Sequence, residues 1–262
     1  MIIEKGRSNP SNKVLCMKII YFSPHLDDAI FSCGGIISHQ VQNNEHVAIW
    51  SFFTADPPTE NLTLFARILH HRWGKMGNPY ALRRQEDIEA CQLLSVEWKH
   101  FGFEDCIYRR YPSNDAPLVR RKTDLFRPVK EPETKLEGQL FDLIQRNLSP
   151  QDQIVLPLEA GGHIDHVLTK NVGNLFNNKK YYYPDFPYAG KLKSVDELNL
   201  PKSAEVSRFS LDRSDITLWK KASATYRSQI SSFWKSTEVL EDEIEEFAVS
   251  PLGATLWSIP VP

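Results

Sequence analysis

Several features that mark other protein classes are missing from this chain. Its four cysteines, Cys16, Cys33, Cys91 and Cys106, show no CxxC spacing. We therefore expect buried free thiols in a reducing, cytoplasmic compartment and no disulfide framework. No apolar run approaches the length of a membrane span, and residues 1–10 lack the apolar core of a signal peptide. We expect no membrane span.

An excess of basic residues is also missing. The chain has 31 Lys and Arg against 33 Asp and Glu, and its net charge is -2. A nucleic-acid partner usually leaves a basic footprint, so we expect no such partner. The 262 residues are 41% hydrophobic and 24% charged, without an internal repeat or a low-complexity tract. This composition is ordinary for a globular protein that is long enough to bury a sizeable core.

The expected organisation is a single domain over residues 13–262 after a flexible N-terminus, residues 1–12. Residues 8–12, Ser-Asn-Pro-Ser-Asn, have the composition of a loop. Patterns of strands and helices then alternate, which predicts an α/β fold with a Rossmann-like, mainly parallel sheet flanked by helices. A smaller C-terminal section is expected to cover the site. The predicted strands are 14–22, 46–53, 96–103, 152–158, 180–183 and 205–211, and the predicted helices are 82–94, 136–148, 165–176 and 213–230.

Three further expectations concern the connections. Residues 54–80 are too long for a routine connection and predict a functional loop with a helical turn. Residues 104–132 carry many Arg, Pro and Asp with little periodicity, which predicts a surface excursion. The pair Gly34-Gly35 is expected to let the first helix lie close to the sheet.

The first chemical cluster is His25, Asp27 and Asp28, directly after the apolar run 14–22 and a Ser-Pro turn. Ligands bind at the carboxyl ends of strands in open α/β sheets. One imidazole and two carboxylates this close together need a cation, and His with Asp suits Zn²⁺.

A second cluster, His163, Asp165 and His166, follows the predicted strand 152–158. If the two strands are neighbours in a parallel sheet, the clusters face each other. His25, Asp28 and one histidine of the second cluster would then supply three ligands and leave a fourth position for water, as in a catalytic zinc site. The remaining aspartate and histidine could serve as base and acid. A lone histidine is more often an ordinary core or surface residue, but two clusters at strand ends favour function.

These motifs resemble those of the LmbE/PIG-L family of zinc-dependent N-deacetylases. Residues 24–28, Pro-His-Leu-Asp-Asp, resemble the family's PHPDD signature, and residues 163–166, His-Ile-Asp-His, resemble its HxDH partner. Residues 83–86 resemble RRxE, residues 183–189 resemble Y-x-D-x-PYA, and residues 221–229 are similar to the C-terminal KAxxxYxSQ segment. The resemblance spans residues 17 to about 230.

The resemblance implies a division of roles within the clusters. His25, Asp28 and His166 would hold one zinc per chain, or another divalent metal, and Asp27 would be the general base. His163 would be the protonated partner, oriented by Asp165. The substrate would be an N-acyl amino sugar such as an N-acetylglucosamine derivative, or a related small glycoconjugate, which loses its acetyl group.

Three residues are candidates for contacting the substrate. Arg83 could reach a substrate hydroxyl or phosphate, and Asp185 and Tyr188 lie in a segment that Pro184 and Pro187 keep rigid. The oligomeric state cannot be predicted.

Two residues depart from the family's pattern. Leu26 replaces a proline, which leaves every ligand in place, and a PHLDDA form resembles the branch that acts on glycosides of natural products. Ala29 replaces a glutamate, which is expected to remove a hydrogen bond behind the ligands.

Two alternatives stay open. The first is a nucleotide-binding α/β protein, although no GxGxxG opens the first helix and Gly34-Gly35 follows the cluster. The second is a binding protein that keeps the fold and has lost catalysis.

Overall fold

One mixed sheet organises the computed structural model, which describes residues 3–4, 17–74, 78–131 and 133–260. Eight strands of these residues join in the order β1-β4-β3-β2-β5-β6-β8-β7. They are β1 (Ile3–Glu4), β2 (Ile19–Ser23), β3 (Val47–Ser51), β4 (Glu97–His100), β5 (Gln153–Pro157), β6 (Lys179–Tyr183), β7 (Glu205–Arg208) and β8 (Thr255–Ser258).

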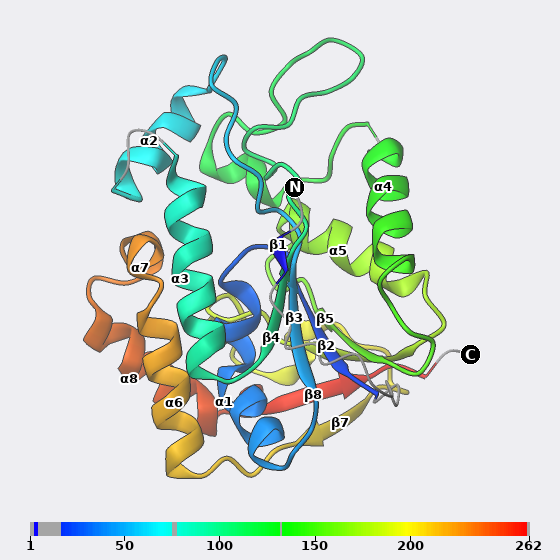
Figure 1. Ribbon diagram of the computed structural model, residues 1–262, viewed down its shortest axis with the longest axis vertical. Coiled ribbons are helices and arrows are strands. Elements are labelled where there is room, and N and C mark those ends of the chain that lie inside the picture. Colours follow the sequence, from blue (N-terminus) through cyan, green and yellow to red (C-terminus); the bar gives the residue numbers. More distant parts are fainter. Residues whose placement is uncertain (1–2, 5–16, 75–77, 132, 261–262) are drawn as a thin grey trace.

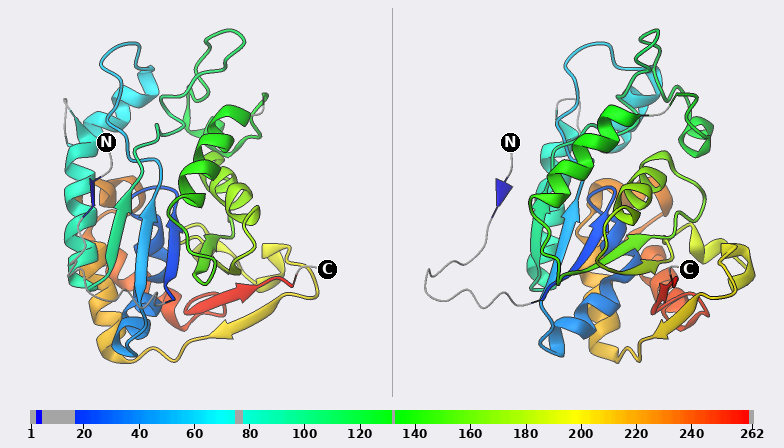
Figure 2. Two further views of the ribbon diagram at one scale, coloured as in Figure 1. Left: turned by 45° about the vertical axis from the view of Figure 1, so that its right-hand side comes forward. Right: turned by 90° about the vertical axis from the view of Figure 1, so that its right-hand side faces the viewer.

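Helices cover both faces of the sheet, so the molecule has three layers (Figures 1 and 2). Helices α1, α3 and α6 lie on one face, and α4 and α5 lie on the other. The helices are α1 (Asp28–Gln42), α2 (Leu64–Arg72), α3 (Pro79–Leu93), α4 (Thr134–Gln145), α5 (Ile164–Asn174), α6 (Arg213–Ala224), α7 (Arg227–Phe233) and α8 (Thr237–Val249). Short 3₁₀ segments are η1 (Lys122–Phe126), η2 (Ala189–Lys191) and η3 (Val195–Leu198).

Strand β2 lies at the centre and pairs in parallel with both β3 and β5. The chain fills one side of β2 with β3 and β4, and then crosses to the other side with β5 and β6. The order of the strands therefore reverses between β2 and β5, which is where open α/β sheets bind ligands. The predicted mainly parallel α/β fold is confirmed, with β1, β8 and β7 adding antiparallel pairs at the two edges.

Side chains of β2 alternate between two cores. Ile19 and Tyr21 join the core that includes α1 and α6, while Ile20 and Phe22 join the core that includes α4 and α5. All five residues of β2 are buried, which is typical of a central strand in a sheet covered on both faces. The continuous apolar run in the sequence is thus explained by burial on two sides.

The predicted surface excursion over 104–132 is correct for most of its described residues, but not for 105–109 and 118–119, which are buried. This segment supplies Cys106, Ile107, Tyr108 and Val119 to a third buried cluster, together with Trp73 and other residues near α2. Its irregular backbone lacks the periodicity that marks a helix or strand, although it is packed against its neighbours. The predicted loop 54–80 contains α2, whose first turn is capped by the Thr63 hydroxyl.

The single helix predicted over 213–230 is also wrong, because it is divided into α6 and α7. At the break, Thr225 Oγ1 donates to the carbonyl oxygens of Glu86 and Ala222, and Tyr226 Oη donates to Asp87 at 2.7 Å. These bonds to α3 fix a turn that the helical pattern did not indicate. Helix α8 and strand β8 were not predicted.

Gly34 and Gly35 serve a different contact from the one we expected. A Cβ atom on Gly34 would lie 2.3 Å from Cδ1 of Trp219 in α6, and one on Gly35 would lie 2.6 Å from Leu211. The glycines therefore bring α1 close to α6 and not to the sheet. Trp219 is fully buried, and its indole N–H donates to the carbonyl oxygens of Ile30 and Phe31.

Cys33, Cys91 and Cys106 are buried free thiols, as expected, while Cys16 lies outside the described residues. Residues 3 and 4 of the predicted flexible N-terminus form β1, and the rest of that segment lies outside the described residues. The single domain over 13–262 stays a prediction.

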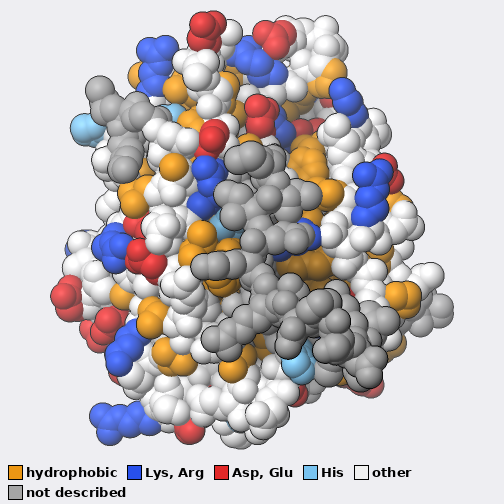
Figure 3. Space-filling view, in the orientation of Figure 1, with side chains coloured by type: hydrophobic (Ala, Val, Ile, Leu, Met, Phe, Trp, Pro, Cys, Tyr) orange, Lys and Arg blue, Asp and Glu red, His pale blue; other side chains and the backbone are white. Residues whose placement is uncertain are grey.

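In the described part of the chain, no helix has the length and apolar character needed to span a bilayer. On the face shown in Figure 3, side chains of Lys and Arg are interspersed with those of Asp and Glu.

Candidate metal centre

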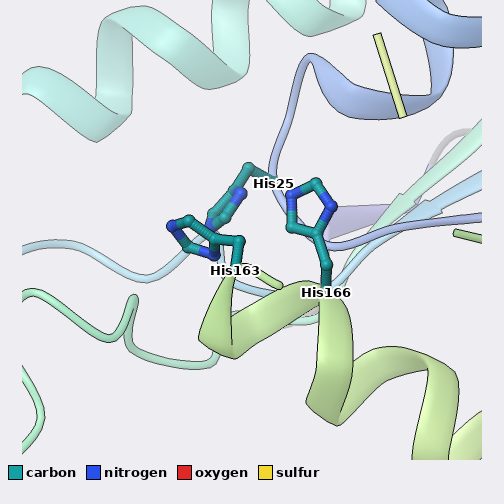
Figure 4. Close-up of side chains that lie close together, drawn as sticks. All are labelled: His25, His163 and His166. Atoms are coloured by element: carbon teal, nitrogen blue, oxygen red, sulfur yellow. The ribbon is translucent and has the colours of Figure 1, made fainter. Parts of the chain in front are cut away.

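The two chemical clusters meet at the carboxyl ends of β2 and β5. His25, Asp27 and Asp28 follow β2, and His163, Asp165 and His166 lie at the start of α5 after β5. Because β2 and β5 pair in parallel, their ends lie side by side, as the sequence analysis required. Figure 4 shows the three imidazoles facing one another, His25 from the loop after β2 and the other two from the start of α5.

Backbone contacts hold the first cluster in place. Ser23 Oγ donates to the carbonyl oxygen of His25 and accepts from the backbone N–H of Ala29. Asp28 is the first residue of α1, and its Oδ2 accepts from the backbone N–H of His25 at 2.7 Å. A carboxylate at a helix N-terminus is also favoured by the helix dipole. The position of Asp28 is therefore set by the turn itself.

The second cluster depends on a glycine turn. Gly161 and Gly162 have φ values of +90° and +70°, a backbone conformation that side chains with a Cβ rarely adopt. The chain then enters α5 with His163 as its N-cap, and His163 Nδ1 accepts from the backbone N–H of Asp165 at 3.3 Å. One turn of helix brings His166 onto the same side as His163.

Asp28 Oδ2 is the point on which the cluster converges. It lies 3.0 Å from His25 Nδ1 and 3.2 Å from His166 Nε2. The second nitrogen of each ring faces a buried carboxylate: His25 Nε2 lies 3.1 Å from Asp165 Oδ2, and His166 Nδ1 lies 2.5 Å from Asp185 Oδ1. Metal-ligating histidines almost always present their second nitrogen to such an acceptor.

Two distances within the donor set of His25, Asp28 and His166 suit a zinc ion. Two ligand atoms of a tetrahedral zinc lie about 3.3 Å apart when each is about 2.0–2.1 Å from the metal. The distances from Asp28 to His25 and His166 are close to this value. Three other sets have ligand atoms that all lie within 4.8 Å of one another: His25, His163 and His166; Cys106, His163 and Asp165; and His25, Asp105 and Asp165. Asp28 suits a cation better than His163 does. Its carboxylate supplies negative charge, whereas His163 Nδ1 already accepts a hydrogen bond from the backbone N–H of Asp165.

Charge at this point also favours a cation. The carboxylates of Asp27, Asp28, Asp105, Asp165 and Asp185 are gathered here, and Arg83 and Arg109 are the arginines that contact them among the described residues. Burial lowers the pKa of His166, but Asp28 and Asp185 outweigh it and raise this pKa to about 10. The site therefore stabilises positive charge between the two rings and Asp28.

Asp27 is a neighbour of Asp28 with different partners. It is 4% exposed, and Arg83 Nη2 lies 3.4 Å from its Oδ1. Burial raises the pKa of Asp27 to about 6, although the positive charge of Arg83 opposes this. A carboxyl group with such a pKa can exchange protons near neutral pH.

His163 differs from the other two histidines. Burial, with the positive charge of His25 and His166, lowers its pKa to about 3, although Asp165 acts in the opposite direction. The expected contact between the Asp165 carboxylate and His163 is replaced by others: Asp165 accepts from Arg109 at 2.6 Å, Cys106 N at 3.0 Å and His25. A protonated His163 would also place an Nδ1–H donor against the Asp165 N–H donor. The neutral form is thus favoured.

The three predicted substrate residues lie in different places. Arg83 is 3% exposed and sits between the rings of Trp73 and Tyr80, each 4.9 Å from its guanidinium carbon. Asp185 is occupied by His166 and by the backbone N–H of Ala160. Both side chains are buried, and their contact with a substrate stays a prediction.

Tyr188 does lie at the edge of the site, next to aromatic residues that we did not predict. Its ring centroid is 6.2 Å from that of His166 and 5.7 Å from that of Phe126 in η1. Phe126 also packs edge-on against His163, with centroids 5.7 Å apart. On its other side Tyr188 contacts Phe233, which is 42% exposed.

Asp105, Cys106, Arg109 and Phe126 were missed because they lie in the segment 104–132. A signal existed for Asp105, which follows β4 at a third parallel strand end and lies 3.6 Å from His25 Nε2. No such signal marked Arg109 or Phe126.

Two further motifs contact each other behind the site. Glu86 in α3 is 1% exposed and accepts from Ser228 in α7 twice, from the backbone N–H at 3.0 Å and from Oγ at 2.6 Å. Asp87, the next residue of α3, accepts a hydrogen bond from Tyr226 Oη. The C-terminal section is thus attached to the helix that carries Arg83.

Fold and site together define an α/β protein with a buried His/Asp centre, suited to a metal ion, where the strand order reverses. The model of the family "PIG-L: GlcNAc-PI de-N-acetylase" matches residues 20–175, which is more than half of the chain. The chain belongs to this family.

Relatives with assigned activities show the same resemblance. A 2'-N-acetylparomamine deacetylase of Streptomyces fradiae is 26% identical over 189 residues, which cover 68% of this chain and 60% of that protein. The match therefore spans less than two thirds of the relative. The zinc-inhibited form of teicoplanin deacetylase Orf2 has a TM-score of 0.76 at 23% identity and covers 92% of this chain and 97% of its own. The A40926 pseudoaglycone deacetylase Dbv21 has a TM-score of 0.68 at 23% identity, and the match covers 92% of this chain and 96% of that one.

The contact between Glu86 and Ser228 leads to a testable prediction. Burial raises the pKa of Glu86, and the bonds from Ser228 oppose this by stabilising the ionised form. Ser228→Ala should therefore lower the free energy of unfolding by about 1.5–3 kcal/mol at neutral pH, as expected for a hydrogen bond to a charged group. Below the raised pKa of Glu86 the group is protonated in the folded state, so the loss should shrink as the pH falls. Urea unfolding at pH 7 and near the ordinary glutamate pKa of 4.5 measures both.

Ser232 in the same helix is a matched control, because its buried Oγ has no hydrogen-bond partner among the described residues. Ser232→Ala should change stability by less than about 0.5 kcal/mol at either pH. An equal loss in both variants, or a loss in Ser228→Ala that does not depend on pH, would contradict the assignment.

Proposed function

We propose that this chain is a zinc-dependent N-deacetylase that removes an acetyl group from an N-acylated amino sugar or a related small glycoconjugate. One observation carries the proposal: His25 Nδ1 and His166 Nε2 converge on Asp28 Oδ2, and their second nitrogens face buried carboxylates. Membership of the PIG-L family and the deacetylase relatives support the reaction and the kind of substrate.

His25, Asp28 and His166 would hold the metal, with one zinc per chain. Zinc bound by three protein side chains polarises a carbonyl group and lowers the pKa of a water molecule to about 7. Asp165 and Asp185 fix the ring orientations of His25 and His166. In this proposal Asp185 positions a ligand, which replaces its predicted contact with the substrate.

Asp27 is the proposed general base. Its carboxylate takes a proton from the attacking water as the new C–O bond forms, and it returns that proton to the leaving nitrogen as the C–N bond breaks. The products are a free amine and acetic acid, which keeps the second proton of the water and then releases it to become acetate. Arg83 lies on the other side of Asp27 and would hold it in place.

His163 is proposed as a hydrogen-bond donor to the carbonyl oxygen. Because Nδ1 accepts from the Asp165 N–H, a neutral His163 carries its proton on Nε2. Such a donor stabilises the charge that develops on the oxygen. This role differs from the protonated partner that the resemblance implies.

The sugar would lie on the aromatic side of the site. Phe126, Tyr188 and Phe233 come from three separate segments and line the edge next to His163. Aromatic rings with a few polar groups are typical of small-ligand sites. We propose that their faces contact the apolar side of the sugar ring.

The metal ligands can be tested by zinc analysis of dialysed protein. Alanine at His25, Asp28 or His166 removes one of three ligands, so the zinc content should fall from about one per chain to near zero. His71→Ala is the control, because His71 is an exposed histidine in α2. Wild-type protein without zinc would reject the proposal, and tight nucleotide binding by that protein would favour the nucleotide-binding alternative.

The two neighbouring aspartates should differ. Asp27→Asn should keep zinc and slow turnover of an N-acetylated amino sugar by about 10²–10⁴, the contribution of a positioned base. Asp28→Asn should lose zinc. The reverse result would mean that the two roles are exchanged, and zinc-loaded wild-type protein that is inert to all such substrates would favour the binding-protein alternative.

Substitution of His163 separates the two roles considered for it. His163→Ala should keep zinc and lower kcat by about 10²–10³, the usual cost of removing one donor to an oxyanion. His163→Gln retains an N–H donor and should recover part of this loss, and neither variant should change the basic limb of the pH–rate profile. Disappearance of the basic limb in both variants would show that His163 acts as a protonated acid.

A further inference from the structure

Arg109 lies behind the metal centre and has no role in the proposed reaction. It belongs to the irregular segment after β4 and is 7% exposed. Every nitrogen of its guanidinium donates a hydrogen bond: Nη1 donates to Asp165 Oδ1 at 2.6 Å and to the carbonyl oxygen of Glu104 at 3.0 Å. Nε and Nη2 donate to the two oxygens of Glu133 at 2.7 and 2.9 Å. The ring of Phe53 lies under it, 5.0 Å from the guanidinium carbon.

These contacts form a chain that ends on a predicted ligand. Glu133 holds Arg109, Arg109 holds one oxygen of Asp165, and the other oxygen of Asp165 lies 3.1 Å from His25 Nε2. His25 then presents Nδ1 to Asp28. Arg109 is therefore separated from the ligand by a single carboxylate.

Asp165 depends on this arginine. Its side chain is completely buried, and a buried carboxylate without a cationic partner is costly. Without Arg109, one oxygen of Asp165 would lose its charged partner, and the carboxylate could turn away from His25.

We propose that Arg109 is a positioning residue of the metal centre: through Asp165 it fixes the ring of His25, and Glu133 fixes Arg109. The inference rests on the proposed zinc site. It also gives the segment 104–133 a function, because the segment carries both Arg109 and the Cys106 N–H that binds Asp165.

The test measures zinc affinity by competition with a chromophoric chelator, together with thermal unfolding of the metal-free protein. Arg109→Gln should weaken zinc binding by about 10–100-fold, the usual effect of removing a partner behind a metal ligand. Arg109→Lys keeps the charge but not the fork of donors, so its zinc affinity should lie between those of the wild type and Arg109→Gln. Glu133→Gln leaves the bond to Asp165 in place, so a loss smaller than that in Arg109→Gln is expected.

Arg110 is a matched control, because it is the next residue and its partially exposed side chain bonds to Asp115 and the carbonyl of Asn61. Arg110→Gln should leave zinc affinity unchanged. Wild-type zinc affinity in a folded Arg109→Gln protein, with only its thermal stability lowered, would overturn the inference and leave the proposed function intact. Failure of all three variants at Arg109 and Glu133 to fold would show an ordinary structural ion pair and would also overturn it. Wild-type protein that binds no zinc would reject the proposed function itself.

Discussion

Negative charge buried at the end of the central strands is the constraint on which the site depends. Asp27 and Asp165 are held in place by Arg83 and Arg109, which come from separate parts of the chain. Asp28 differs from both, because its partners are two imidazoles. Buried carboxylates are tolerated only when they are paired or bound to a metal. The arrangement therefore leaves Asp28 as the place where a cation would complete the balance.

The need to pair buried carboxylates also brings segments that are distant in the sequence into contact. Arg83 in helix α3 contacts Asp27. On the same helix, Glu86 accepts a hydrogen bond from Ser228, and Asp87 accepts one from Tyr226. The break between α6 and α7 allows this contact. Two motifs recognised separately in the sequence are thus one structural unit, in which the C-terminal section supports the helix beside the proposed base.

The departures from the family's pattern have simple structural settings. Leu26 is buried in the third hydrophobic cluster, which also includes Tyr80 and Ile164, and Ala29 is buried in the core around α1. Hydrogen bonds behind the two histidines come instead from Asp165 and Asp185. A carboxylate at position 29 is therefore not needed to orient the ring of either proposed ligand.

The sequence by itself determined the α/β class, the central strands and the meeting of the two clusters, because periodicity and strand ends are local properties. Those properties led to His25, Asp28 and one histidine of the second cluster without any knowledge of their contacts, and the family resemblance then singled out His166. Only the tertiary structure decided which carboxylate serves which histidine, and that Arg109 and Phe126 belong to the site. These two residues lie in a segment without periodicity, where position depends on packing against distant residues and leaves no repeating pattern in the chain.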